Sequence, residues 1–364
     1  MGGYGPRTDD GRIMKIGLAG SLLTFTGALM IALPPPVAAQ SPPADWTVPR
    51  LADGTPDFQG NWSNATLTPI VRAEGQPLVL SLEQVVAMEG GRQDLIEAEA
   101  QPSDPDREAP PVGGDGSTGA AGGVGGYNYF FIDAGDRVAR YNGEPRSSLI
   151  TEPGNGRRPP FTEEGRRRLA ERRAFSRQFG PYDNPENRPL GERCLMSFGS
   201  NGGPPMLPNY FYNNNYTIVQ TPSAIMIMTE MVHDVRIIRM AEPKRLPEHM
   251  RPWMGDSWGR WVGDTLVVET TNIHPDQPMF ALSAAQFTPS ESIRVVERFT
   301  RASERQLNYE FAVEDPIMLT APVRGEVPFN RLDGLVYEYA CHEANYAMEN
   351  VLSGARAQEQ NERR

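Results

Sequence analysis

The feature that most constrains this chain is a hydrophobic period of two residues, which begins near residue 216 and lasts to residue 342. Apolar and polar side chains alternate there in short runs separated by turn residues, a pattern typical of strands with one buried face. Consecutive strands of this kind form an antiparallel meander, and a long meander curls into a barrel or half-barrel. We therefore expect a mainly β fold, with strands near 217–221, 224–231, 235–240, 260–262, 265–271, 293–300, 306–313, 324–327 and 335–342.

Helices are expected only around this meander. Residues 81–100 have helical spacing of apolar side chains, interrupted near Gly90 and Gly91. Thr162, followed by Glu163 and Glu164, predicts the start of a helix that ends near residue 178, with a solvated arginine-rich face. A last helix is expected at 344–357. The sequence thus predicts one β-rich domain at 40–364 with a few peripheral helices and a C-terminal helix, in which 81–190 is a helical and Gly/Pro-rich insertion and 101–126 a flexible loop.

The N-terminal residues 1–39 have the features of a signal peptide. Lys15 precedes an apolar run at 16–33, and small residues lead to Ala39. The alternative, a retained membrane anchor, is disfavoured by the small-residue cleavage site and the prolines before it. We expect cleavage after Ala39 and a periplasmic or secreted mature protein without a stable membrane anchor.

Charge and motif content exclude several function classes. The net charge of −11 argues against nucleic acid and anionic membranes as partners. Lys244 is the one lysine left after residue 39, so Schiff-base chemistry is disfavoured. A phosphate-binding loop and a serine nucleophile motif are both absent from the sequence. The expected partner is a small-molecule ligand or substrate, with no cofactor, and the oligomeric state stays open.

The two cysteines, Cys194 and Cys341, fit an oxidising compartment. One disulfide that ties the middle of the chain to its last strand is the favoured interpretation. The alternative pairs a free Cys341 thiolate with His342 as a nucleophile. Neighbours on a strand point to opposite faces, which makes that arrangement sterically awkward.

Candidate catalytic residues gather in the stretch 226–272. In an unbroken strand, Glu230, Asp234 and Arg236 share one face, and His233 points away. A bulge near Val232 would bring His233 round to join them. His233 would then act as a base, Asp234 or Glu230 would orient it, and Arg236 would stabilise a developing anion. The second candidate pair is His342 with Glu343.

Later strands each carry one central carboxylate. The functional interpretation places these groups in the polar lining of a barrel lumen, and the structural alternative places them in cross-strand ion pairs on a wet outer face. For most of them the ion pairs are favoured. The carboxylates are Glu269, Glu297, Glu310 and Glu338, with Arg294 and Arg298 among them.

Three tryptophans are candidates for ligand binding, because indole rings stack on sugars and aromatic molecules; they could equally plug one end of a barrel. Met228 and its neighbouring methionines would shape the same pocket. Asp256 lies in a turn, where it either caps backbone amides or takes part in the site. The spacing of histidines and carboxylates matches no metal motif, so no metal is expected. The tryptophans are Trp253, Trp258 and Trp261.

Several short motifs are spread along the chain, among them PDFQGNW at 56–62, RCL at 193–195, HDVR at 233–236, GDTLVVET at 263–270 and ACHEANY at 340–346. Through these motifs, and over nearly all of the mature chain, the sequence resembles a family of uncharacterised exported proteins from Gram-negative bacteria. That resemblance implies export but no activity. A weaker likeness to lipocalin-type β-barrels rests on Gly60, Asn61 and Trp62 before a meander, and implies ligand binding.

Two functions therefore fit the sequence. The first is an exported small-molecule-handling barrel protein that acts as a metal-free acid–base enzyme, a hydrolase, isomerase or lyase, on a partly apolar organic substrate. The second is a non-catalytic periplasmic binding protein for a carbohydrate or hydrophobic ligand. Catalysis requires the histidine and carboxylates to converge in a closed pocket, whereas binding does not.

Overall fold

The structure is a computed structural model that describes residues 46–100, 106, 132–197, 201–240, 244–281 and 283–364. These residues belong to one compact unit, which spans 38–364. The expected signal peptide lies outside the described residues, and so does the expected loop at 101–126 apart from residue 106. No helix among the described residues is long and apolar enough to cross a membrane.

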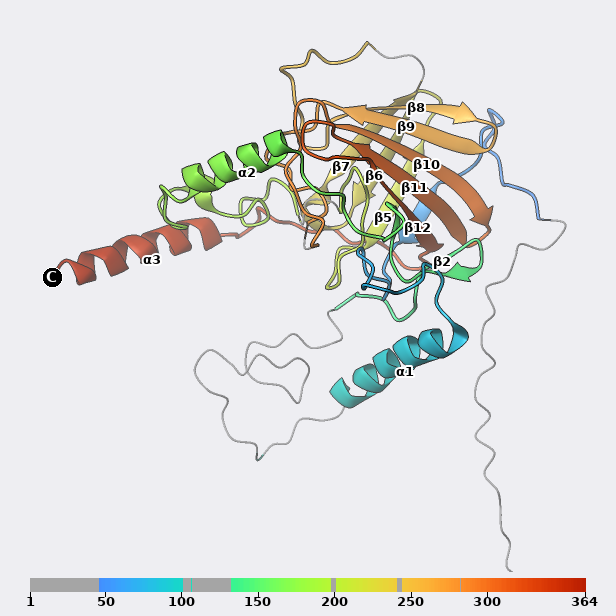
Figure 1. The fold of residues 1–364 in the computed structure, drawn as a ribbon, viewed down its shortest axis with the longest axis horizontal. Helices are drawn as coiled ribbons and strands as arrows, with labels where there is room; N and C mark the ends of the chain where they lie inside the picture. The colour runs from blue at the N-terminus through green and yellow to red at the C-terminus, as the bar shows by residue number, and fades with distance from the viewer. Residues whose placement is uncertain (1–45, 101–105, 107–131, 198–200, 241–243, 282) are drawn as a thin grey trace, which may run out of the picture. The chain divides into compact units, whose positions relative to one another are not determined.

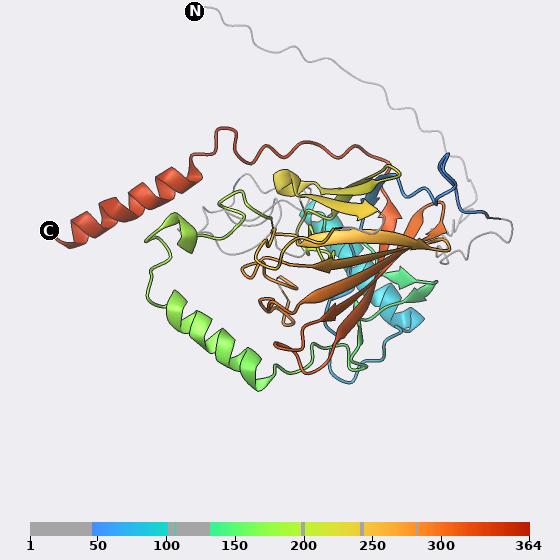
Figure 2. The same cartoon turned by 90° about the horizontal axis from the view of Figure 1, so that it is seen from above.

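The alternating pattern folds into a β-barrel, as expected (Figures 1 and 2). In the described residues nine strands close the barrel, because β1 pairs with both β5 and β12. The strands are β1 (Gly60–Ser63), β5 (Asn215–Gln220), β6 (Ala224–Thr229), β7 (Val235–Met240), β8 (Asp256–Val262), β9 (Thr265–Thr271), β10 (Arg294–Ser303), β11 (Gln306–Glu314) and β12 (Val323–Arg331). A further strand, β4 (Ile150–Glu152), pairs with the other end of β12.

Two parts of the meander differ from expectation. β7 and β8 run parallel, whereas the other barrel neighbours are antiparallel. The expected strand at 335–342 is wrong, because the chain leaves the barrel after β12 and residues 335–342 pair with no strand of the described chain. Alternation of apolar and polar residues indicates a segment with one apolar and one polar face. It does not show whether a neighbouring strand has an unpaired edge that the segment can join.

The barrel interior is filled. Its aromatic core includes Tyr216, Tyr309 and Phe329, whose rings lie 5.1 to 5.5 Å apart. The segment 201–209 is buried throughout and enters this core, where the Tyr309 hydroxyl accepts a hydrogen bond from the Met206 backbone N–H (2.9 Å). Gly203 lies in this segment at a φ of 80°, and a Cβ there would lie 2.8 Å from the Met206 side chain. The lumen is therefore packed with protein.

Three α-helices of the described chain lie outside the barrel: α1 (Leu82–Glu99), α2 (Glu163–Ser176) and α3 (Ala347–Glu362). Helix α1 is continuous, so the expected break at its glycines is wrong; α3 begins and ends later than expected. The Thr162 cap of α2 is confirmed by its hydrogen bond from the Gly165 N–H (2.9 Å). The remaining elements are the hairpin β2 (Arg140–Tyr141) and β3 (Glu144–Pro145) and the short 3-10 turns η2 (Pro185–Asn187) and η3 (Met231–His233).

Candidate functional site

The strand that carries the expected catalytic cluster is broken rather than bulged. β6 ends at Thr229, and η3 follows, with Val232 at a φ of 59°. The break separates the partners of the expected cluster. Glu230 accepts a hydrogen bond from Asn215 Nδ2 (3.1 Å), and Asp234 accepts one from the Ser197 backbone N–H (3.2 Å). The side chain of His233 lies outside what the structure describes.

Glu230 has an acidic neighbour in Asp133. The pKa of Asp133 is raised to about 6, first by burial and then by the nearby negative charge of Glu230. Asn214 links the same segment to the barrel, because its Nδ2 donates to the Asp133 carbonyl (2.6 Å).

Arg236 lies inside the filled barrel and not in an open site. Its guanidinium forms a two-pronged ion pair with Glu297, and the two side chains expose 2% and 0% of their surface. Ser257 and Thr270 accept further hydrogen bonds from Arg236 at 2.9 Å, and the Tyr309 hydroxyl donates to Glu297 Oε1 (2.9 Å). Every arm of the arginine is engaged by protein, so the expected role in stabilising a substrate anion is wrong for Arg236.

The other central carboxylates lie on the wetter outer side of the barrel. Glu269 pairs with Arg294 across β9 and β10, and Glu310 lies 4.0 Å from Arg298 across β10 and β11. Cross-strand ion pairing, the favoured expectation, is confirmed for these two glutamates. Glu297 is the exception that points inward. Glu338 is exposed and lies outside any strand.

The three candidate tryptophans do not meet. Trp261 packs edge-on against Phe58, with ring centroids 5.3 Å apart, and Trp258 lies under the guanidinium of Arg245 (5.1 Å). Trp253 stacks on His274, with ring centroids 3.9 Å apart. A single tryptophan platform built from all three is therefore ruled out.

Met228 and Asp256 also lie away from a common pocket. Met228 alternates with the buried Ile227 and Thr229 of β6 and points to the outer side of the barrel. Asp256 is buried in an ion pair with Arg239 and accepts a hydrogen bond from the Leu246 N–H (2.9 Å). Asp256 therefore holds the connection before β8, as the turn-cap alternative expects.

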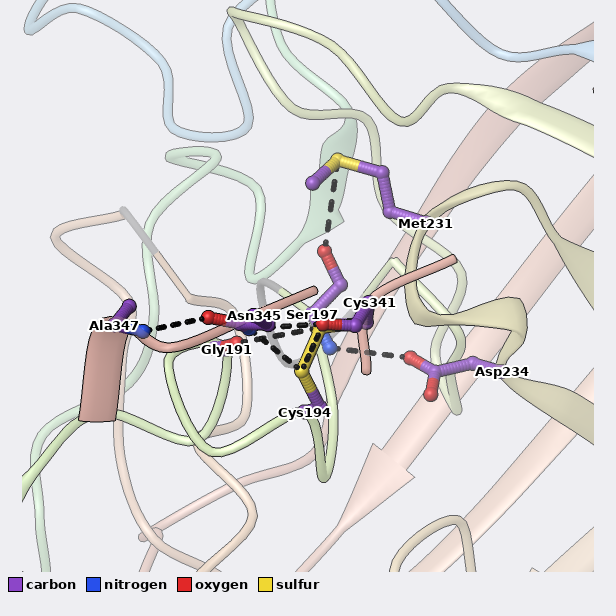
Figure 3. Close-up of a disulfide and its surroundings, with 8 residues drawn as sticks. All are labelled: Gly191, Cys194, Ser197, Met231, Asp234, Cys341, Asn345 and Ala347. Carbon is purple, nitrogen blue, oxygen red and sulfur yellow. Dashed lines mark hydrogen bonds between the residues drawn. A yellow bond between two sulfur atoms is a disulfide. The ribbon is translucent and has the colours of Figure 1, made fainter. Parts of the chain in front are cut away.

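The expected disulfide is confirmed: Cys194 and Cys341 are bonded, with Cα atoms 5.9 Å apart (Figure 3). Asn345 braces it, because its Nδ2 donates to the Cys341 carbonyl (2.8 Å) and lies 3.5 Å from the Cys194 sulfur. The disulfide removes Cys341 as a nucleophile. His342 and Glu343 are exposed beside it, and His342 borders a depression of about 300 Å³.

A cavity of about 1270 Å³ forms an open cleft beside the barrel. One wall is α2 with the segment 184–193, and the other comprises η3 with residues near 253 and 274–281. Arg172 bridges the two walls, because its guanidinium pairs with Asp276 (2.7 Å). The aromatic and sulfur-bearing lining residues are Phe175, Phe179, Tyr212, Met231, Trp253 and Tyr339.

A backbone hydrogen bond assigns the tautomer of the neutral His274 ring in this cleft. The Asp276 backbone N–H donates to His274 Nδ1 (3.1 Å), which assigns the proton of a neutral ring to Nε2. The pKa of His274 is lowered from 6.5, first by burial, with the positive charges of Arg172 and Arg251 acting in the same direction and Asp276 opposing them. At neutral pH the ring is therefore an uncharged hydrogen-bond donor with a flat face stacked on Trp253.

Of the expected site residues whose side chains the structure describes, Trp253 and Met231, one of the methionines beside Met228, line the cleft. The residues that sequence reasoning missed are chiefly Phe175, Arg193 and His274. Phe175 had a usable signal, because a large apolar residue at the end of a helix as charged as α2 indicates a contact beyond that helix. Arg193 and His274 had none, since their neighbourhood is assembled from distant segments.

Among the described residues, no three histidine, cysteine, aspartate or glutamate side chains gather in a way that could hold a metal ion. Comparison with models of protein families, with characterised proteins and with solved structures yields no match to this chain.

Proposed function

We propose that this chain is an exported protein that binds a small, partly apolar organic molecule in the cleft between α2 and the barrel. The observation that carries the proposal is the exposure of aromatic side chains around a concave site. Phe175 exposes 61% of its surface and Phe179 exposes 38%, and both line the cleft. Exposed aromatic groups that gather around a cavity mark a ligand site, because solvent exposure of so much apolar surface is otherwise unfavourable.

Binding fits this cleft better than acid–base catalysis. A general base needs a free lone pair within reach of substrate. His274 Nδ1 already accepts a hydrogen bond, and Nε2 of the neutral ring carries the proton. Arg236, the expected anion stabiliser, lies in the packed barrel. The cleft therefore offers stacking faces and donors rather than a proton-transfer pair.

Export rests on two observations of different kinds. The residues 1–39 have the pattern of a cleavable signal peptide. The disulfide between Cys194 and Cys341 is compatible with an extracellular location, since such bonds persist in oxidising compartments. A periplasmic or secreted location follows as part of the proposal, and the mass of the mature protein tests it through the expected start at Gln40.

The test of the cleft uses 1-anilinonaphthalene-8-sulfonate, an aromatic dye that becomes fluorescent in apolar sites. We expect saturable binding to the folded protein at one site. Trp253→Ala should raise the dissociation constant about tenfold, because a stacking face worth roughly 1.4 kcal/mol is lost. Trp258→Ala is the matched control, because Trp258 is a tryptophan outside the cleft lining, and it should change the constant by less than about twofold.

Near-ultraviolet circular dichroism checks that each variant is folded. Absence of saturable binding to the wild-type chain, or equal weakening by both tryptophan substitutions, would overturn the proposed site.

A further inference from the structure

We propose that the cleft selects an organic anion and that Arg193 binds its acidic group. The ligand class is an aromatic or otherwise apolar acid with a carboxylate or sulfonate. This inference rests on the proposed function and adds the charge that the ligand carries and the residue that recognises it.

The first step concerns the ionised side chains of the cleft wall. Two of its arginines are already neutralised within the wall. Arg172 pairs with Asp276 at 2.7 Å, and Arg188 forms a two-pronged pair with Glu192, with both distances at 2.8 Å. The two charges within each pair cancel, so these residues do not need a counter-ion from a ligand.

Arg193 is different. It is half-buried in the cleft wall, and among the described residues its guanidinium has no side-chain hydrogen bond or ion pair. A partly desolvated cation without a partner is unfavourable, and an anionic ligand would relieve that cost. Glu186, the remaining charged residue of the lining, is exposed, so water already solvates its carboxylate.

The backbone around Arg193 is held firmly. Its N–H donates to the Pro189 carbonyl (3.2 Å), and the next residue, Cys194, is fixed by the disulfide. A guanidinium on an anchored backbone loses less conformational freedom when it binds, and its planar fork matches two oxygens of a carboxylate or sulfonate. The disulfide thus has a second role, as the support of a binding residue.

The rest of the lining fits the body of such an acid. The stacked pair of Trp253 and His274 offers a flat wall. Phe175 and Phe179 pack edge to face with centroids 5.3 Å apart and offer an apolar wall. His274 Nε2–H is a second donor for a polar substituent. A molecule with an aromatic body and one acidic group therefore fits the stacking faces of the cleft and the guanidinium of Arg193.

The experiment compares two dyes with the same anilinonaphthalene body: 1-anilinonaphthalene-8-sulfonate, which is anionic, and N-phenyl-1-naphthylamine, which is neutral. We expect the wild-type chain to bind the anionic dye about tenfold more tightly, the contribution of one charge-assisted pair in a half-buried site. This preference should decrease with added salt, because mobile ions screen a partly exposed pair.

Arg193→Gln should remove the preference and leave the affinity for the neutral dye within about twofold of the wild type. Arg193→Lys should keep part of the preference, because it keeps the charge and loses the fork. Arg260→Gln is the control for net charge, since Arg260 is exposed and lies outside the cleft lining.

The outcomes separate the two proposals. Saturable, Trp253-dependent binding of both dyes with equal affinity would overturn the inference and leave the binding function standing. Unchanged affinity for the anionic dye in a folded Arg193→Gln variant would also overturn it. Failure of both dyes to bind the wild-type chain would overturn the proposed function itself.

Discussion

Replacement of Glu297 by Gln tests whether Arg236 is a structural residue. The substitution keeps the size of the side chain and removes the one negative charge that faces the guanidinium inside the barrel. Arg236 would remain charged, because its pKa lies far above neutral pH. Its charge would then be buried without a counter-ion.

The expected cost follows from burial and distance. The two side chains expose 2% and 0% of their surface. Two unit charges about 4 Å apart attract by about 4 kcal/mol at an effective dielectric constant of roughly 20. Breaking a buried pair by removing one partner costs about 3–5 kcal/mol. Gln keeps one acceptor for Arg236 and Tyr309, so we expect a loss near about 3 kcal/mol in the free energy of unfolding.

Urea unfolding of the oxidised protein, followed by tryptophan fluorescence and circular dichroism, measures this loss. The slope with denaturant should be unchanged. The double variant Arg236→Met with Glu297→Gln removes both charges and should be less destabilised than the sum of the two single variants by roughly 3 kcal/mol. Dye binding to the cleft should survive in every folded variant. A loss below about 1 kcal/mol for Glu297→Gln, or additive single variants, would refute the reasoning.

Three further predictions concern titration and the disulfide. Because the pKa of Asp133 is raised from 3.8 to about 6, its ionised carboxylate destabilises the folded protein at neutral pH, and this cost disappears as pH falls from 6 to 3.8. Asp133→Asn should therefore stabilise the protein by up to about 3 kcal/mol at pH 7 and hardly at all below pH 3.8. Equal urea midpoints of the variant and the wild type at pH 7 would contradict this prediction. Because the pKa of His274 is lowered from 6.5 in the folded protein, the unfolded chain binds a proton at this ring before the folded chain does as pH falls. The contribution of His274 to stability is therefore complete above pH 6.5 and is lost as pH falls below 6.5. An NMR titration of the ring C–H resonance measures the pKa, and a midpoint at or above 6.5 would refute this direction. Loss of the disulfide in the Cys194→Ser, Cys341→Ser double variant should cost less than the roughly 5 kcal/mol that chain entropy allows for 147 residues, because residues 335–346 lie outside any strand and can fray once the bond is removed, while the barrel stays folded. Hydrogen exchange should then show lost protection in α3 with the barrel intact, and a uniform loss of protection would contradict this prediction.

The barrel was largely predictable because its signal is local. The strands β5, β6, β7 and β10 each have a run of alternating side chains that reveals a buried face before any partner is known. The closure by β1 was not predictable, since four residues at Gly60–Ser63 carry too little pattern to name neighbours as distant as β5 and β12. Whether β7 and β8 run parallel depends on the path of the connection between them, which the alternation does not encode.

The site was harder to predict, for a physical reason. Glu297 could have been placed inward, because Val295 and Phe299 lie two residues away on the same face. The cleft had no such signal. Its residues come from α2, the disulfide segment and the turn at His274, and only the tertiary fold brings these together.

The pairing of β1 with β12 also determines when the barrel can close during folding. Synthesis delivers Gly60–Ser63 early and Val323–Arg331 late, so the first strand of the ring must wait for the last. Until β12 arrives, β1 and β11 each present an unpaired edge, and contacts between such distant segments form slowly. Closure of the barrel is therefore a late step in folding. Before this step, the unpaired strand edges make the protein most prone to association with its own copies.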